Sequence, residues 1–123
     1  MLDVSSTHPF EVCAAFAVRF IRHLANGDLT AAESLVDVND TGGPFAESFV
    51  APEPGPDGFS YAHPDRIPSW SMSVLQADEL GLRLDFEVPF AEAEYEGRSL
   101  SARFELRRVG DMLEVRLTGA VPN

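Results

Sequence analysis

The chain has 123 residues, 45% of them hydrophobic and 24% charged, and its 20 acidic and 9 basic residues leave a net charge of −11. A chain of this length and hydrophobicity can bury a core without disulfides or metal, which excludes wholesale disorder. The acidic balance argues against binding to nucleic acid or to an anionic membrane surface, because both need a basic face. It is compatible with a basic protein partner, since complementary charge steers association, and also with plain solubility.

Cysteine content and the first residues bear on location. Cys13 is the only cysteine, so neither an intramolecular disulfide nor a metal-binding pair of cysteines is possible. Residues 1–10 lack the basic start and the continuous apolar run of a signal peptide, and no apolar stretch reaches transmembrane length. The sequence therefore predicts a cytoplasmic location, no membrane association, no metal site and no cofactor.

Two helices are predicted near the start of the chain. Pro9 suits the first position of a helix, and Asn26-Gly27 supplies a stop signal. Asp28 is then a good N-cap for a second helix, which the short connection places beside the first. The first helix carries an apolar stripe, and the second an apolar side. The stripe consists of Phe10, Cys13, Phe16, Ala17, Phe20, Ile21 and Leu24, and the side of Leu29, Ala32, Leu35 and Val36.

Residues 39–69 differ in kind from the two helices. Six of the nine prolines fall in this range, and proline at this density forbids a long helix or a central strand. The range also carries Phe45, Phe49, Phe59 and Tyr61, which a polar linker would lack. We expect a single domain over residues 1–123, in which 39–69 is a loop held to the core by these aromatic side chains, with a short helix near 45–50.

From Trp70 onward apolar and polar residues alternate in four runs, each with one apolar and one polar or charged face. This pattern predicts a half-buried antiparallel sheet, arranged as a β-meander. The fold class is therefore α+β, with two helices packed on a curved sheet of about four strands. The apolar faces contain, in order, Trp70, Met72 and Val74; Leu82, Leu84, Phe86, Val88 and Phe90; Leu100, Ala102, Phe104 and Leu106; and Leu113, Val115 and Leu117.

Gly110-Asp111 predicts the register of the last hairpin. As a two-residue turn it pairs apolar with apolar on one face and opposite charges on the other. The predicted pairs are Leu106–Val115 and Phe104–Leu117 on the apolar face, and Arg107–Glu114 and Glu105–Arg116 on the charged face. We interpret the charged face as a lattice of solvated salt bridges that holds register. Acid–base chemistry there would require one carboxylate to be desolvated.

The hairpin before it needs a loop of odd length to keep its faces aligned. A three-residue turn at Tyr95-Glu96-Gly97 meets this requirement. Pro89 lies on the charged side of its strand, which predicts an edge or a bulge at that point.

The most site-like stretch is residues 61–65, which put a phenol, an imidazole and a carboxylate within five positions. Histidine titrates near neutrality, so Tyr61, His63 and Asp65 are the candidate catalytic residues, although their spacing matches no named triad and such clusters also arise by chance. Trp70 is the candidate ligand-binding residue, as a pocket wall, with a place in the core as its alternative role. The sequence has no phosphate-binding loop, no serine nucleophile elbow and no His/Cys metal cluster.

The segment FIRHLANGDLTAAESLVD resembles the opening of the NTF2-like (cystatin-related) superfamily, in which two helices joined at a Gly-Asp precede a strongly curved antiparallel sheet. The later segments IPSWSMSVLQ, LDFEVPF and EGRSLSARFELRRVGDMLEVRL are similar to small bacterial domains with the same order of elements. The resemblance implies a cone-shaped pocket between helices and sheet. It implies no single activity, because the superfamily contains isomerases, cyclases and dehydratases as well as non-catalytic binding and dimerising modules.

These observations lead to one functional hypothesis and two alternatives. The hypothesis is a non-enzymatic binding module of the bacterial cytoplasm, a protein-interaction or immunity-like partner of a basic protein. The first alternative is a small-molecule binding protein or an isomerase- or dehydratase-like enzyme, with Tyr61, His63, Asp65 and Trp70 at the mouth of an NTF2-like pocket. The second is a homodimer that pairs through an exposed sheet face or edge.

Overall fold

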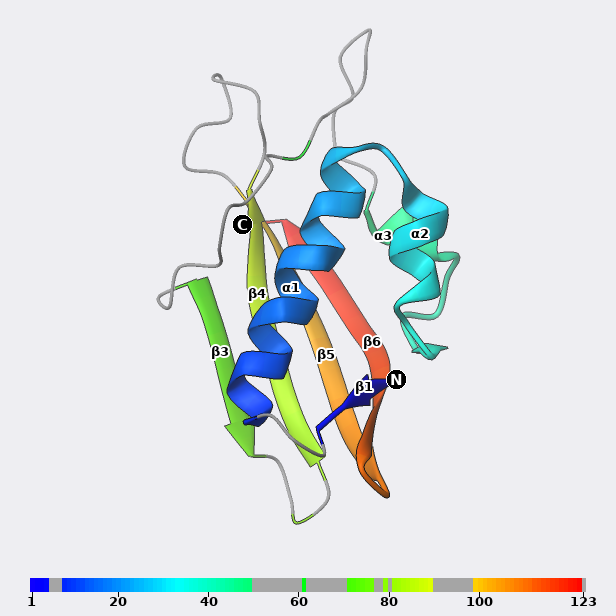
Figure 1. The fold of residues 1–123 in the computed structure, drawn as a ribbon. Coiled ribbons are helices and arrows are strands. Elements are labelled where there is room, and N and C mark those ends of the chain that lie inside the picture. The colour runs from blue at the N-terminus through cyan, green and yellow to red at the C-terminus, as the bar shows by residue number, and fades with distance from the viewer. Residues whose placement is uncertain are drawn as a thin grey trace, which may run out of the picture.

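The computed structural model describes residues 1–4, 8–49, 61, 71–76, 79, 81–89 and 99–122. Its elements are β1 (Leu2–Asp3), α1 (Pro9–Ala25), α2 (Leu29–Ser34), β2 (Val38–Asn39), α3 (Phe45–Ser48), β3 (Met72–Gln76), β4 (Gly81–Pro89), β5 (Ser99–Val109) and β6 (Met112–Pro122). Figure 1 shows α1 lying across one face of the sheet, while α2, β2 and α3 gather beside β6. The fold class is α+β, as predicted.

The sheet is curled and mostly antiparallel, with the order β1-β6-β5-β4-β3. The strands β3 to β6 form the predicted meander. The expected number of about four strands is too low, because β1 and β2 also pair with β6, the first antiparallel and the second parallel. The sequence does not reveal β1 and β2, since each has two residues and an alternation of period two needs a longer run to be recognised.

α1 begins and ends close to the predicted positions. The N–H of Phe10 donates to Nδ1 of the N-cap His8 at 3.1 Å, Pro9 occupies the first helical position, and Gly27 follows the C-cap with a φ of +73°. The predicted stripe is buried from Cys13 to Leu24, whereas Phe10 in the first turn remains 42% exposed. The helix therefore buries one continuous apolar face against the sheet.

The next two helices are short and depend on packing. Asp28 caps α2 as predicted, since its Oδ1 accepts from the N–H of Ala31 at 3.0 Å. α3 lies where a short helix near residues 45–50 was predicted, and it buries Phe45 and the adjoining Phe49. These two rings hold the start of the 39–69 range to the core.

The predicted register of the last hairpin is confirmed in all four pairs. Gly110 has a φ of +63° and every described non-glycine residue has a negative φ, so the glycine supplies the left-handed position that the turn requires. Beyond Phe104 the register shifts by one residue, and at this irregularity the hydroxyl of Thr118 donates to the carbonyl of Arg103 at 3.2 Å.

The register of β4 on β5 differs from the one that a turn at Tyr95-Glu96-Gly97 would impose. That turn lies outside the described residues, but regular pairing continued from it would place Val88 opposite Phe104. In the structure Leu84 is opposite Phe104, four residues away. The even shift keeps every side chain on its predicted face. It also places Arg83 opposite Glu105, where the other register would have placed Glu87 and opposed two carboxylates.

Pro89 is the last residue of β4, and it pairs with Ser99 without a break in register. The predicted bulge is therefore absent at this point of the described chain. The predicted edge is present, because the pairing of β3 with β4 ends at Phe86 and no described strand flanks Pro89 on its other side.

The core lies between α1 and the inner faces of β4, β5 and β6. Phe16 meets Phe104 edge-to-face, with ring centroids 5.2 Å apart, and Phe86 stacks on Phe104 at 5.5 Å. Phe20 contacts both of these strand residues and also Phe45 and Phe49 of the α3 region. Each fully buried phenylalanine contributes about 1.5–3 kcal/mol by removal from water, and each ring pair about 0.5–1.5 kcal/mol more.

The hairpin register predicts a charge-reversal result. Glu114→Arg should destabilise the protein by about 0.5–1 kcal/mol, because it opposes Arg107 directly across the strands. Adding Arg107→Glu to the same chain should recover part of the loss, as measured by urea denaturation. Asp111→Arg in the exposed turn serves as the control for added positive charge. Equal stabilities of the single and double variants would contradict a coupling between these positions.

Candidate functional site

Tyr61 is the one predicted catalytic candidate within the described residues, and its surroundings are those of a structural side chain. It is only 5% exposed, and its hydroxyl donates to the backbone carbonyl of Phe49. Burial raises the pKa of the phenol to about 12. Tyr61 thus ties the middle of the 39–69 range to the end of α3, as expected for an aromatic anchor. His63, Asp65 and Trp70 lie outside the described residues.

Cys13 is enclosed in the core and is a poor nucleophile. It is fully buried, and burial raises the pKa of its thiol from the ordinary value of 9.0 to about 11. A thiol acts as a nucleophile or metal ligand through its thiolate, which is scarce at neutral pH when the pKa is this high. The role predicted for Cys13 in the apolar stripe of α1 is confirmed.

The side of β3–β6 that faces away from α1 is mostly polar, and we call it the outer face; its exposed apolar residues are Leu75, Val109 and Val121. It carries four arginines and four carboxylates on β4, β5 and β6, and the register sets opposite charges across neighbouring strands. The opposed pairs are Arg83–Glu105, Asp85–Arg103, Glu105–Arg116 and Arg107–Glu114.

The predicted lattice of cross-strand salt bridges does not form on this face. Among the described residues, Arg83 binds Asp85 along its own strand at 3.2 Å, and Arg116 binds Asp40 at 3.4 Å. None of the four opposed pairs lies within ion-pair distance. An ion pair between solvated side chains contributes little free energy. The register therefore places these side chains on opposite strands without their forming ion pairs.

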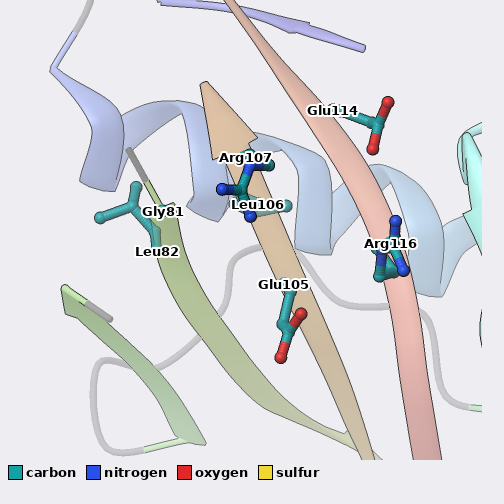
Figure 2. Close-up of a pocket in the computed structure, with 7 residues that line it drawn as sticks. All are labelled: Gly81, Leu82, Glu105, Leu106, Arg107, Glu114 and Arg116. Carbon is teal, nitrogen blue, oxygen red and sulfur yellow. The ribbon is translucent and has the colours of Figure 1, made fainter. Parts of the chain in front are cut away.

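Two hollows bounded by described residues open on the outer face. The larger, of about 230 Å³, is lined by charged side chains of β5 and β6 and by Gly81 at the start of β4. Figure 2 shows Glu105, Arg107, Glu114 and Arg116 around it, with α1 behind the sheet. Gly81, which is the register partner of Arg107, lines this hollow on β4.

The second hollow, of about 220 Å³, surrounds Asp85 and includes Ser73, Glu87 and Arg103. One carboxylate oxygen of Asp85, Oδ2, forms an ion pair with Nε of Arg83, but its other oxygen, Oδ1, is buried without a hydrogen-bond partner. A buried carboxylate oxygen without a donor is costly, so this atom marks a place where a donor is missing.

A second surface is acidic. From His23 to Asp65, inclusive, the chain has eight acidic residues and no arginine. Five of the eight are described and exposed on α2, β2, α3 and their connections, which gather beside β6 (Figure 1). We call these residues the acidic edge: Asp28, Glu33, Asp37, Asp40 and Glu47. The sequence reasoning missed this surface, although the arginine-free interval is visible in the sequence.

Asp37 of the acidic edge completes the pairing of β6. Its Oδ2 accepts from the buried N–H of Val115 at 2.8 Å, and its own N–H donates to the carbonyl of Val115 at 2.9 Å. The Met1 amino group lies 3.0 Å from the same carboxylate. Asp37 therefore provides the hydrogen-bond partners of Val115 in β6, at the position between its pairing with β1 and its pairing with β2. Glu33 and Glu47, in contrast, have no cationic partner among the described residues.

Features of several other kinds of protein are absent from the described part of the chain. No group of three or more His, Cys, Asp or Glu there could hold a metal ion. None of the described helices has the length and apolar character needed to cross a membrane. Comparison with protein-family models, curated proteins and solved structures finds no match to this chain.

Removal of the Asp37 carboxylate should destabilise the protein. Asp37→Ala leaves the buried N–H of Val115 without an acceptor, which should lower the free energy of unfolding by about 1–3 kcal/mol. Asp37→Asn keeps an acceptor oxygen and should lose less. Asp40→Ala, which breaks only an exposed ion pair, is the control and should cost at most about 1 kcal/mol. A smaller loss in Asp37→Ala than in Asp40→Ala would contradict the assigned role.

The raised pKa of Cys13 predicts a loss of stability at alkaline pH. Between pH 9 and 11 the unfolded chain releases the thiol proton and the folded chain keeps it, so the free energy of unfolding falls as pH rises. The stabilisation is complete below pH 9, and its loss by pH 11 is on the order of 2 kcal/mol. Cys13→Ala, compared with its own stability at pH 7, should show a shallower decline over this window. Parallel curves for the two proteins would refute the prediction.

Proposed function

We propose that this chain is a non-enzymatic binding module that recognises a basic protein through the acidic edge. The observation that carries the proposal is the unequal distribution of charge. The outer face holds equal numbers of carboxylates and arginines, so it presents little net field, whereas the acidic edge holds five carboxylates and no arginine. A surface of one sign attracts partners of the opposite sign and raises their association rate.

The acidic edge combines fixed and free carboxylates, as a recognition surface requires. Asp28 and Asp37 are held by backbone N–H groups of Ala31 and Val115. Asp40 contacts Arg116 in an exposed pair that a partner could exchange at low cost. Glu33 and Glu47 project from neighbouring helices with no described cation to neutralise them. Arginine and lysine side chains of a partner are the groups that would satisfy them.

A cytoplasmic location and an NTF2-like form of the α+β fold belong to the same proposal. The curled sheet with helices on one face is compatible with the NTF2-like arrangement. In the described part, the space between α1 and the sheet is filled by phenylalanine rings, with Phe16, Phe20, Phe86 and Phe104 in mutual contact. This filling favours recognition at the surface over a small-molecule site between the helices and the sheet.

Binding of an arginine-rich peptide tests the acidic edge. We expect the wild-type protein to bind a fluorescent arginine-rich peptide at low ionic strength and to lose affinity as salt is added. The triple variant Glu33→Gln, Asp40→Asn and Glu47→Gln should bind about tenfold more weakly, because each lost contact is worth up to about 1 kcal/mol. Asp28 and Asp37 are left intact because they stabilise the fold. Fluorescence anisotropy measures both affinities.

A control with the same change in net charge separates a local surface from general acidity. The triple variant Glu11→Gln, Glu79→Gln and Asp111→Asn neutralises three exposed carboxylates away from the acidic edge. It should bind the peptide nearly as well as the wild type. Equal losses in the two triple variants would contradict recognition by the acidic edge, and absence of peptide binding by the wild type would contradict a basic partner.

A further inference from the structure

The outer face is a large surface that the proposed function does not use. It spans β3 to β6 on the side of the sheet away from α1, and Figure 2 views it with α1 behind the sheet. Its charges are distributed with regularity, because each carboxylate on β5 or β6 has an arginine directly opposite on a neighbouring strand. These opposed charges do not contact one another across the strands. Arg103, Glu105 and Glu114 form no ion pair among the described residues, and the Arg83–Asp85 and Arg116–Asp40 pairs are partly exposed, so these groups can contact another molecule.

The register of β4 and β5 makes this face complementary to itself. Consider a two-fold axis that is parallel to the strands and lies above the boundary between β4 and β5. This axis places each β4 residue of one copy over the β5 residue of the other copy that is its register partner within a single sheet. Opposite charges in register within one sheet thus become opposite charges in contact between two sheets. If the register paired residues of the same charge within one sheet, the same two-fold axis would bring those like charges together between the two copies.

The four outer positions of β4 from Gly81 to Glu87 each meet a suitable group under this operation. Two pairs join opposite charges, one brings a carboxylate over a hydroxyl, and one brings an arginine over the open space at a glycine. The pairs are Asp85 with Arg103, Arg83 with Glu105, Glu87 with Ser101, and Gly81 with Arg107, each between one copy and the other.

The two hollows fit the same arrangement. The hollow above Gly81 is about 230 Å³ and is lined by two carboxylates and two arginines, so it offers room and acceptor oxygens for the Arg107 side chain of a second copy. The hollow at Asp85 contains the buried Oδ1 atom without a donor, and Arg103 of a second copy would supply that donor. Face-to-face sheets keep their strand directions within about 30°, so the two central charged pairs stay opposed despite the twist.

We propose that the outer face is the interface of a symmetric homodimer, in which Asp85 and Arg103 of one copy bind Arg103 and Asp85 of the other. The centre of the surface is polar, so the central contacts are charge pairs and bridging water, while the exposed side chains of Leu75, Val109 and Val121 lie toward its margins. The acidic edge beside β6 lies outside the central β4–β5 pairs and can bind its own partner independently.

Charge reversal at the central pair tests the interface. Sedimentation equilibrium over a concentration series should show a monomer–dimer equilibrium for the wild type. Asp85→Arg or Arg103→Asp should each raise the dimer dissociation constant at least about tenfold, because each converts two attractive contacts into two repulsive ones. Arg19→Asp, on the exposed side of α1, makes the same charge change as Arg103→Asp and should leave the dimer intact.

A mixing experiment distinguishes a lost interface from a damaged fold. Chains with Asp85→Arg and chains with Arg103→Asp should each be monomeric alone, yet an equimolar mixture should form a heterodimer with affinity near that of the wild type. The two-fold axis places Arg on one chain against Asp on the other at both central contacts. Circular dichroism should show that each single variant is folded.

Three results would overturn the proposal. The first is a wild-type protein that stays monomeric up to its highest soluble concentration. The second is a dimer that both charge reversals leave unchanged, which would place the contact at another surface, such as the edge of β3. The third is a mixture of folded single variants that remains monomeric, since a two-fold contact between positions 85 and 103 requires the heterodimer.

Discussion

The burial of one face of α1 against the inner face of the sheet is the interaction on which the rest of the structure depends. Phe16 and Phe20 of the helix lie against Phe86 and Phe104 of the strands, and all four rings are buried. Side chains of a strand alternate between its two faces, so this contact commits every second residue of β4, β5 and β6 to the core. The remaining residues form the outer face as a direct consequence.

The register then determines how charge is distributed on the outer face. A shift of an even number of residues leaves the core unchanged but alters which charges oppose one another. In the observed register Arg83 opposes Glu105 and Arg103 opposes Asp85, so the face is balanced in charge. The net charge of −11 is therefore carried elsewhere, and among the described residues it is concentrated where α2, β2 and α3 lie beside β6. Both surfaces that we propose for binding follow from this separation.

The two edges of the sheet differ in how they end. β6 is covered by β1 and β2, and the Asp37 carboxylate satisfies the N–H of Val115 between them. β3 is the last strand on the other side among those that the structure describes, and its five residues carry no formal charge. Charge on an edge strand normally opposes pairing with another chain, so the β3 edge is the natural competitor to the outer face as a site of association.

Much of the fold is predictable from local pattern, and the candidate site much less so. The 3.6-residue period of α1, the cap at Asp28 and the alternation of β4–β6 each depend on residues close in sequence, and all three predictions are confirmed. The strands β1 and β2 are too short to show a period, and they exist only because β6 offers them a partner. Tyr61 illustrates the limit for chemistry: a phenol near a histidine in the sequence suggests a site, and only the structure shows that this phenol is buried and donates to the carbonyl of Phe49.

The sequence by itself determined the α+β class, the apolar face of each long element and the pairing of the last hairpin, because these depend on periodicity and on one tight turn. Only the tertiary structure decided the register of β4 on β5, the grouping of acidic residues beside β6 and the missing donor at Asp85. Each of these depends on contacts between residues distant in the chain, and a four-residue shift between β4 and β5 preserves every local pattern while changing which charges meet.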